Sequence, residues 1–280
     1  MILIADSGST KTSWNVVSGE TVIDSTETEG LNPYFQSEEN ITLCITDKVV
    51  PRLHVDTQAI RAVYFYGAGC AYNKEEVVRR AVARVFTTAN IEVNTDLLGA
   101  ARALCGREAG IACIMGTGSN SCFYDGLQIV RHVSPLGFIL GDEGSGADMG
   151  KHLIGHLMKD MMPQRLKESF FALYRLTPAE IIDHVYSRPH PGRFLAGFAP
   201  FLLQNADETS VRRLVMNRFK AFFVRNVYKY DYRRYKVNFI GSIAFHFIDM
   251  LKESARRTGC RIGLVAASPV DGLVDYHTHA

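Results

Sequence analysis

Two short segments of this sequence share one layout, and this echo constrains the fold more than any other feature. Residues 5–14 read ADSGSTKTSW and residues 114–123 read IMGTGSNSCF. In each, an apolar run ends in a turn that contains Gly-Ser, and a second β-type run follows. Such runs around a glycine turn are typical of paired strands. If the echo is not accidental, the chain consists of two related α/β halves, each with a glycine hairpin.

The first hairpin is not a P-loop, although it ends in Lys-Thr. A P-loop reads G-x-x-x-x-G-K-[ST] and opens a helix. With Lys11 and Thr12 as its last two letters, glycines would be required where Ala5 and Thr10 stand. The residues that follow, TSWNVVSGETVID, are strand formers around a Ser-Gly turn. We therefore predict a turn between two antiparallel strands, whose N–H groups and hydroxyls could bind phosphate.

The hydrophobic pattern of the rest predicts a mixed α/β chain. Apolar residues make up 47% of the sequence, enough for a substantial core. Almost the whole stretch from 146 to 236 reads as helical, and TPAEII at 177–182 has the form of a capping box. Further helices are expected at 37–53, 73–86, 97–106 and 243–257, and further strands at 62–69, 91–96, 110–133, 236–242 and 261–269.

Composition excludes several classes of protein. A net charge of +2 is too small to indicate nucleic acid or an anionic membrane, and no apolar run approaches the roughly 20 residues of a membrane span. The N-terminus reaches Asp6 too early for a signal peptide. The basic and aromatic run at 227–236 comes with no nucleic-acid-binding motif, so we interpret it as a solvated helix end or an interface. His277 and His279 are expected to lie in a mobile tail.

The six cysteines form no C-x-x-C pair and stand mostly in apolar context. This usage indicates buried free thiols in a reducing compartment, so we expect a cytoplasmic protein that contacts neither nucleic acid nor membrane.

Six segments, in order, resemble the N-acetylglucosamine kinase family, which groups with the BadF/BcrA-type ATPases of the actin/hexokinase/Hsp70 superfamily. They are DSGSTKTSW, GLNP, NTDLLGAARA, IMGTGSNS, LGFILGDEGSGADMGK and FIGSIA. The resemblance implies an α/β fold of two actin-like ATPase (ribonuclease H-like) domains flanking a deep cleft. The domains would be residues 1–108 and 109–280, the second with a helical insertion at about 152–236. It further implies ATP and Mg²⁺ as cofactors, an amino sugar as substrate, and a homodimer.

For the nucleotide, the resemblance points to the two glycine hairpins and to the segment FIGSIA. Glycine permits a tight turn and lets the backbone approach phosphate closely. Thr10 corresponds to the family's nucleotide-contacting threonine. Ordinary hairpins, and for Gly241 the end of a strand, remain the alternatives. The implied nucleotide-binding residues are Gly8, Ser9, Thr10, Lys11, Gly116, Thr117, Gly118, Ser119, Gly241 and Ser242.

Two carboxylates are predicted to act in the reaction. Asp96 closes a short strand, so it lies at the edge of a sheet where α/β proteins bind ligands. A carboxylate there can orient a sugar hydroxyl and accept its proton. Asp96 could also cap the helix that follows, and both roles can hold at once. Asp6, at the end of an apolar strand, is predicted to contact Mg²⁺ through water or through another ligand of the ion, with a turn or cap as the alternative.

The sugar is expected to contact the segments GLNP and GDEG. Asn32 offers a donor and an acceptor, which also suits a turn before Pro33. The carboxylates of Asp142 and Glu143 suit adjacent sugar hydroxyls, or the cap of the next helix. Relatives often read Gly-Trp-Gly where this chain has residues 135–137, Pro-Leu-Gly, and this difference leaves the identity of the sugar open. The predicted substrate-binding residues are Asn32, Thr117, Leu136, Gly137, Asp142 and Glu143.

The predicted function is therefore the phosphorylation of an amino sugar at its 6-hydroxyl, with N-acetylglucosamine as the first candidate. The alternative is a sugar-independent ATPase or activator of the BadF type. Those activators hold an iron–sulfur cluster with cysteines, and no suitable cysteine motif stands in this sequence. A sugar-binding regulator is disfavoured because the chain carries no DNA-binding motif.

Overall fold

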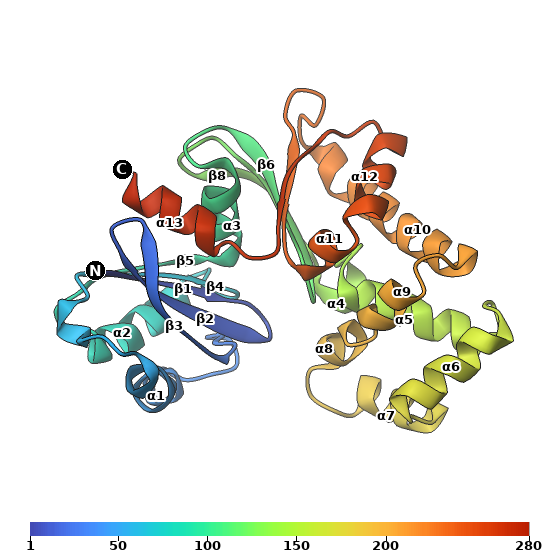
Figure 1. Cartoon of the computed structure of the whole chain (residues 1–280), viewed down its shortest axis with the longest axis horizontal. Coiled ribbons are helices and arrows are strands. Elements are labelled where there is room, and N and C mark those ends of the chain that lie inside the picture. Colours follow the sequence, from blue (N-terminus) through green and yellow to red (C-terminus); the bar gives the residue numbers. More distant parts are fainter. Residues whose placement is uncertain (280) are drawn as a thin grey trace. The chain divides into compact units, whose positions relative to one another are not determined.

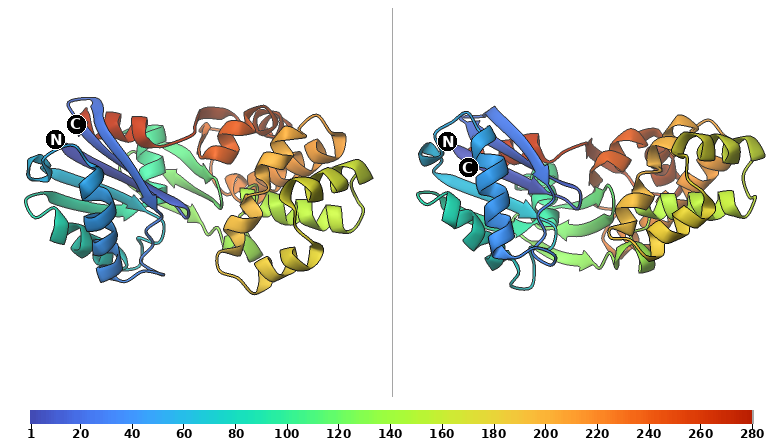
Figure 2. Two further views of the ribbon diagram at one scale, coloured as in Figure 1. Left: turned by 60° about the horizontal axis from the view of Figure 1, so that its bottom comes forward. Right: turned by 90° about the horizontal axis from the view of Figure 1, so that it is seen from below.

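The computed structural model describes residues 1–279 and divides into two compact units (Figures 1 and 2). The first unit comprises Met1–Ala109, Tyr124–Val130 and the segment from Ser268. The second comprises Gly110–Phe123 and Arg131–Ala267. The sequence analysis assigned everything after residue 108 to a second domain. By its contacts, the C-terminal segment instead lies in the first unit.

The first unit is built on a five-stranded sheet with the order β3-β2-β1-β4-β5. Its strands are β1 (Ile2–Ser7), β2 (Lys11–Ser18), β3 (Thr21–Glu29), β4 (Ala62–Gly67) and β5 (Asn90–Thr95). Strands β1, β2 and β3 pair antiparallel, whereas β1, β4 and β5 pair parallel. The carboxyl ends of β1, β4 and β5 therefore lie at one edge of the sheet, and the functional carboxylates predicted for this unit stand there.

Helices cover both faces of this sheet (Figure 1). One face packs on α1 (Glu38–Cys44), its π-helical continuation (Ile45–Val49) and α2 (Glu75–Val85), around the buried Trp14. The other face packs on α3 (Asp96–Cys105) and α13 (Val270–Thr278). Short 3₁₀ turns at Val50–Arg52 and Thr57–Ala59 complete the unit.

The predicted mobile tail is wrong for His277. This residue lies in α13, where its ring stacks on Tyr64 with centroids 3.7 Å apart. The hydroxyl of Tyr66 is 2.8 Å from its Nε2. The ring contacts hold the end of the chain against the first sheet.

The second sheet repeats the strand order of the first. Its strands are β6 (Gly110–Met115), β7 (Ser119–Tyr124), β8 (Ile129–Val133), β9 (Val237–Ile240) and β10 (Ile262–Ala266), in the order β10-β9-β6-β7-β8. The first strand of each half, β1 or β6, lies at the centre of its sheet. The next two strands in sequence lie on one side of it, and two later strands lie on the other side. The echo between the two glycine segments is therefore matched by the topology, and the prediction of two related α/β halves is confirmed.

Helices make up most of the second unit (Figure 2). The predicted helical stretch contains α5 (Gly146–Met158), α6 (Gln164–Tyr174), α7 (Pro178–Tyr186), α8 (Pro191–Ala196), α9 (Ala199–Gln204), α10 (Thr209–Arg225) and a 3₁₀ turn (Val227–Lys229). The capping box at Thr177 and Glu180 is present as predicted. The short α4 (Gly137–Leu140) precedes this stretch, and α11 (Ser242–His246) and α12 (Ile248–Arg257) follow it. One large core unites these helices with the second sheet, with Phe170, Phe219 and Phe222 fully buried in it.

Candidate active site

The first glycine hairpin and the segment GLNP form one packed feature in the first unit. The hairpin closes with a hydrogen bond from the N–H of Gly8 to the carbonyl of Lys11, 3.0 Å long. The N–H of Gly30 donates to the carbonyl of Thr10, and a Cβ at Gly30 would lie 2.4 Å from the carbonyl oxygen of Gly8. Only glycine fits so close to the turn. The Lys11 ammonium pairs with Glu27 on β3.

Asn32 takes part in a turn at Pro33, which was one of the two roles considered for it from the sequence. Its Oδ1 accepts the N–H of Tyr34 at 2.9 Å, and its own N–H donates to Gln36 Oε1 at 2.8 Å. Gly69 has a φ of 82°, and a Cβ there would lie 2.4 Å from Asn32 Oδ1. The amide is therefore held in place next to the end of β4, and its predicted contact with a sugar stays a prediction.

Asp96 is the first residue of α3, but the helix is capped by its neighbour. The Thr95 hydroxyl accepts the N–H of Leu98 at 3.1 Å, whereas Asp96 Oδ1 accepts the adjacent N–H of Leu97, at 2.8 Å. The idea that Asp96 serves as the N-cap is therefore wrong. Burial raises the pKa of its carboxyl to about 6, against the lowering effect of the Leu97 N–H. A carboxyl with this pKa is suited to accept a proton near neutral pH.

Asp6 lies on β1, close enough to Asp96 for the two carboxylates to repel. Burial and this repulsion raise the pKa of Asp6 to about 7, and the charge of Lys11 opposes the shift. A cation bound between like charges would favour their ionised forms. Carboxylate oxygens are suitable Mg²⁺ ligands. Among residues 1–279, no cluster of three or more His, Cys, Asp or Glu could hold a metal by itself. A Mg²⁺ ion would therefore have to take most of its ligands from water or a bound phosphate.

The second glycine hairpin is locked to the loop that follows α4. The N–H of Gly116 donates to the carbonyl of Gly118, and the carbonyls of Gly116 and Thr117 accept the N–H groups of Gly146 and Ala147 at 2.8 and 3.1 Å. The hydroxyl of Ser119 donates to the carbonyl of Glu143 at 2.9 Å. These hydrogen bonds hold residues 141–147 against the second hairpin, whose two strands are largely buried.

Asp142 lies in that loop, and its own backbone is left-handed, with a φ of 53°. Its Oδ1 accepts the N–H of Ser119 at 3.2 Å. Burial and the charges of Glu143 and Asp148 raise the pKa of its carboxyl to about 6, while the Ser119 N–H lowers it. A non-glycine residue in this region is strained, and such strain is often retained at functional positions. The helix cap is Ser145, so neither Asp142 nor Glu143 serves as the cap.

Glu143 makes different contacts from Asp142. One of its carboxylate oxygens accepts a bond from Arg225 at 2.8 Å and the other from Asn226 at 3.2 Å. Leu136, by contrast, is 60% exposed and has a φ of 62°, and the next residue, Gly137, has a φ of 72°. Of the predicted sugar-binding residues in this unit, Glu143 is thus engaged within the protein and Leu136 lies at the surface.

Gly241 ends β9 directly against the second hairpin. Its φ is 125°, and a Cβ there would lie 2.5 Å from the carbonyl of Met115 and 3.2 Å from the N–H of Gly116. Only glycine allows β9 to turn into α11 here, next to Ser242. The structure thus brings the predicted adenosine segment into contact with the second phosphate hairpin, and both lie in the second unit.

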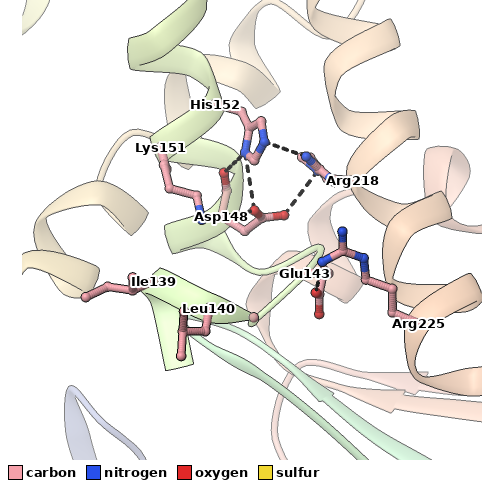
Figure 3. Close-up of a pocket in the computed structure, with 9 residues that line it drawn as sticks. Ile139, Leu140, Glu143, Asp148, Lys151, His152, Arg218 and Arg225 are labelled. Carbon is pink, nitrogen blue, oxygen red and sulfur yellow. Dashed lines mark hydrogen bonds and ion pairs between the residues drawn. The ribbon is translucent and has the colours of Figure 1, made fainter. Parts of the chain in front are cut away.

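The sequence analysis missed Asp148, which is 3% exposed and lies on α5 (Figure 3). One of its carboxylate oxygens accepts the N–H of Gly144 at 2.9 Å and lies 3.2 Å from Arg218 Nε. The other lies 3.2 Å from His152 Nδ1. The network ties the loop that carries Asp142 to α5 and α10. The spacing Ser145-x-x-Asp148 is the capping-box pattern, and it was the available signal.

The described residues show two further features. No helix within 1–279 is long and apolar enough to cross a membrane. All six cysteines are free thiols, five of them buried, as predicted.

Comparison with known proteins gave matches among solved structures. No protein-family model matches the chain, and no curated protein does. A proposed N-acetylglucosamine kinase of Porphyromonas gingivalis is 48% identical, with a TM-score of 0.98 over 100% of this chain and 99% of that one. A proposed N-acetylglucosamine kinase of Chromobacterium violaceum is 14% identical, with a TM-score of 0.74 over 99% of both chains.

A third structure supports the fold alone. A glucokinase of the ROK family from Streptomyces griseus, solved with glucose and AMPPNP, is 17% identical, with a TM-score of 0.62 over 100% of this chain and 98% of that one. Together with the repeated strand order, these matches confirm the predicted α/β class with two actin-like ATPase domains.

Proposed function

This chain belongs to the N-acetylglucosamine kinase family of actin-like ATPases, whose members are ATP-dependent sugar kinases, and we propose that it transfers the γ-phosphoryl group of ATP to the 6-hydroxyl of an amino sugar. N-Acetylglucosamine is the first candidate. The observation that carries this proposal is the half-buried Asp96, whose carboxyl has its pKa raised to about 6, at the sheet edge that also bears the first glycine hairpin.

Asp96 acts as the general base of the proposed reaction. Its carboxylate accepts a hydrogen bond from the sugar 6-hydroxyl and orients the oxygen toward the γ-phosphorus. As the new P–O bond forms, Asp96 takes the hydroxyl proton, and the bond from phosphorus to the bridging oxygen of ADP breaks. The bond from the Leu97 N–H holds the carboxylate at the start of α3.

The two glycine hairpins hold the phosphates of ATP. Ser9 and Thr10 lie at the exposed tip of the first hairpin, and their N–H and hydroxyl groups suit phosphate oxygens. Thr117 serves the same purpose in the second hairpin. Gly241 and Ser242 are proposed to contact the nucleoside, because Gly241 lets β9 turn into α11 directly against the second hairpin. The reaction requires both units to act on one pair of ligands, and this requirement is part of the proposal.

The carboxylate of Asp6, directly or through water, would hold a Mg²⁺ ion that arrives with ATP. When bound, this ion neutralises charge on the β- and γ-phosphates. The raised pKa of Asp6 supports the assignment, because a nearby cation would relieve the repulsion with Asp96.

Asn32, Thr117 and Asp142 are proposed to bind the sugar. Asp142 is better suited than Glu143, since both oxygens of Glu143 already accept bonds from Arg225 and Asn226. Glu143 would then act by holding its loop. Leu136 and Gly137, where relatives often carry Trp-Gly, line the place proposed for the 2-acetamido group. We further propose a homodimer that acts in amino sugar metabolism in the cytoplasm, and light scattering would measure its mass.

A coupled assay of ADP release tests the function. The panel comprises N-acetylglucosamine, glucosamine, N-acetylmuramate and glucose, with a reaction lacking sugar. We expect release that depends on an amino sugar, and NMR of the product should place the phosphate on C6. Equal ADP release without sugar would favour the sugar-independent ATPase, and a phosphate on another carbon would contradict the proposed position.

A further inference from the structure

A cavity of about 150 Å³ lies wholly within the second unit, between α4, α5 and α10 (Figure 3). Its lining includes Glu143, proposed above to hold the loop of Asp142, and none of the residues proposed to bind ATP or sugar. Its volume is well below the roughly 300–1,000 Å³ of sites for larger ligands, so it suits a small group. Its polar lining consists of Glu143, Asp148, Lys151, His152, Arg218 and Arg225.

The charges that line this cavity do not balance. A guanidinium group can only donate hydrogen bonds, so the contact between Arg218 Nη1 and His152 Nε2 requires that Nε2 be unprotonated. The other ring nitrogen, Nδ1, lies 3.2 Å from an oxygen of Asp148. Three cations, Lys151, Arg218 and Arg225, thus face two carboxylates, and the cavity carries one excess positive charge.

Several donors around the cavity are incompletely used. The Nε of Arg218 is buried and makes no well-aligned hydrogen bond, although Asp148 lies 3.2 Å away. A buried donor without an acceptor is costly and calls for an explanation such as an ion or water. Lys151 donates to the carbonyl of Phe138 at 3.0 Å and lies 3.7 Å from Asp148, yet its ammonium has three donors.

We propose that this cavity binds an oxyanion, a phosphate group, through Lys151, Arg218 and Arg225. An oxyanion would neutralise the excess charge and accept the unused bonds, and charged partners make such bonds strong. The cavity also borders Gly141 and Glu143, on either side of Asp142. An anion bound in the cavity would therefore affect the conformation of the loop that carries Asp142. The proposal goes beyond the kinase function and does not depend on it.

Isothermal titration of the full chain, without ATP or sugar and at low ionic strength, tests the proposal. The two probes are inorganic phosphate and N-acetylglucosamine 6-phosphate, which distinguish a free anion from a phosphate carried on a sugar. We expect Lys151→Met to weaken binding of at least one probe by about tenfold or more. Lys151→Arg, which keeps the charge, should bind within a few-fold of the unmodified chain.

Three further variants serve as controls and safeguards. Lys220→Met changes an exposed lysine on α10 outside the cavity and should bind as the unmodified chain does. Thr117→Val is compared with inorganic phosphate alone, because Thr117 is proposed to contact the sugar; it should leave the Lys151-dependent binding of phosphate unchanged, since its hairpin is a separate phosphate site in the proposed function. If Lys151→Met does not fold, Arg225→Met replaces it, since the Arg225 side chain is 65% exposed.

The outcomes decide the proposal. Binding that depends on Lys151 and survives in Thr117→Val supports it, and the preferred probe then identifies the source of the anion. The absence of binding by either probe overturns it. Binding that Lys151→Met and Arg225→Met leave unchanged, or that Thr117→Val removes, also overturns it, because the anion would then lie elsewhere. None of these results bears on whether the chain is a kinase.

Discussion

Replacement of Asp96 by Asn separates the chemistry of this residue from its structural role. The amide keeps the size of the side chain and an oxygen that can accept the Leu97 N–H. The cap of α3 is unaffected, because it comes from the Thr95 hydroxyl. The substitution removes only the negative charge and the ability to take a proton. A loss of activity in Asp96→Asn would therefore not come from a broken helix.

We expect two effects of opposite sign. Turnover should fall by roughly 10²- to 10⁴-fold, the usual range for loss of a general base, while the affinity for ATP changes little. Stability at neutral pH should rise. The pKa of Asp96 is raised from 3.8 to about 6 in the folded protein, so its ionisation opposes folding above that pH. Two pKa units correspond to an upper limit of about 3 kcal/mol.

The pH dependence checks the sign of this argument. A carboxyl whose pKa is raised by folding stabilises the protein below its ordinary pKa, and this contribution is lost as the pH rises through the folded pKa. Asp96→Asn should therefore match the unmodified chain near pH 4 and exceed it in stability above about pH 6. The gain includes relief of Asp6, since the charge of Asp96 raises the pKa of Asp6.

Urea unfolding from about pH 4 to pH 8 and the coupled kinase assay measure both effects. The matched control is Asp249→Asn, the same change at an exposed position in the first turn of α12. It should leave turnover unchanged and produce no comparable gain in stability. Near-normal turnover in Asp96→Asn would remove Asp96 from the catalytic role. Lower stability at neutral pH would refute the account of its burial.

Three more predictions concern the two glycine hairpins, Gly241 and Asp148. Thr10→Val and Thr117→Val should each lower kcat/KM for ATP by roughly 10- to 100-fold, the effect of one hydrogen bond to a charged group, without unfolding the protein; normal kinetics in both would contradict the phosphate hairpins. Gly241→Ala forces a side chain against the carbonyl at the end of β6, so it should destabilise the chain by about 1–3 kcal/mol and weaken ATP binding. Thermal unfolding and nucleotide titration measure these effects, and unchanged values would refute the close approach. Asp148→Asn leaves a buried Arg218 without its charge partner, so it should cost about 3 kcal/mol of stability and raise KM for the sugar more than it lowers kcat; an unchanged KM would show that the loop does not depend on it.

Local signals predicted much of the architecture. The glycine hairpins, the helical stretch and the capping box at Thr177 depend on neighbours in sequence, and the structure has them as expected. The repeated Gly-Ser layout also predicted the two related halves, because the same order of strands follows each hairpin. Asp96 was singled out because the end of a parallel strand is a place that sequence can identify, and its catalytic role stays a prediction.

Contacts between distant segments were not predictable from the sequence. The docking of α13 depends on His277 stacking against Tyr64, far away in the chain. The pairing of Glu143 with Arg225 joins a loop to the end of α10. From the sequence GDEG alone, the carboxylates of Asp142 and Glu143 are equally suited to bind a sugar, and this contact distinguishes them. The cap of α3 was misplaced by one residue for a different reason, since Thr and Asp are both good N-caps and only the backbone geometry decides between them.

The three carboxyls with raised pKa values, Asp6, Asp96 and Asp142, have a common physical basis. Each is removed from water without a cationic partner close enough to restore its ordinary pKa. A structural carboxylate such as Asp148 is buried as well, yet Arg218 and His152 keep its pKa below the usual value. The fold thus contains two kinds of acid with restricted access to water. Those with cationic partners hold loops in place, whereas those without cationic partners reduce stability at neutral pH and are available to a proton, a metal ion or a hydroxyl group. This contrast, more than burial alone, distinguishes the carboxyls proposed to act on ligands from those that support them.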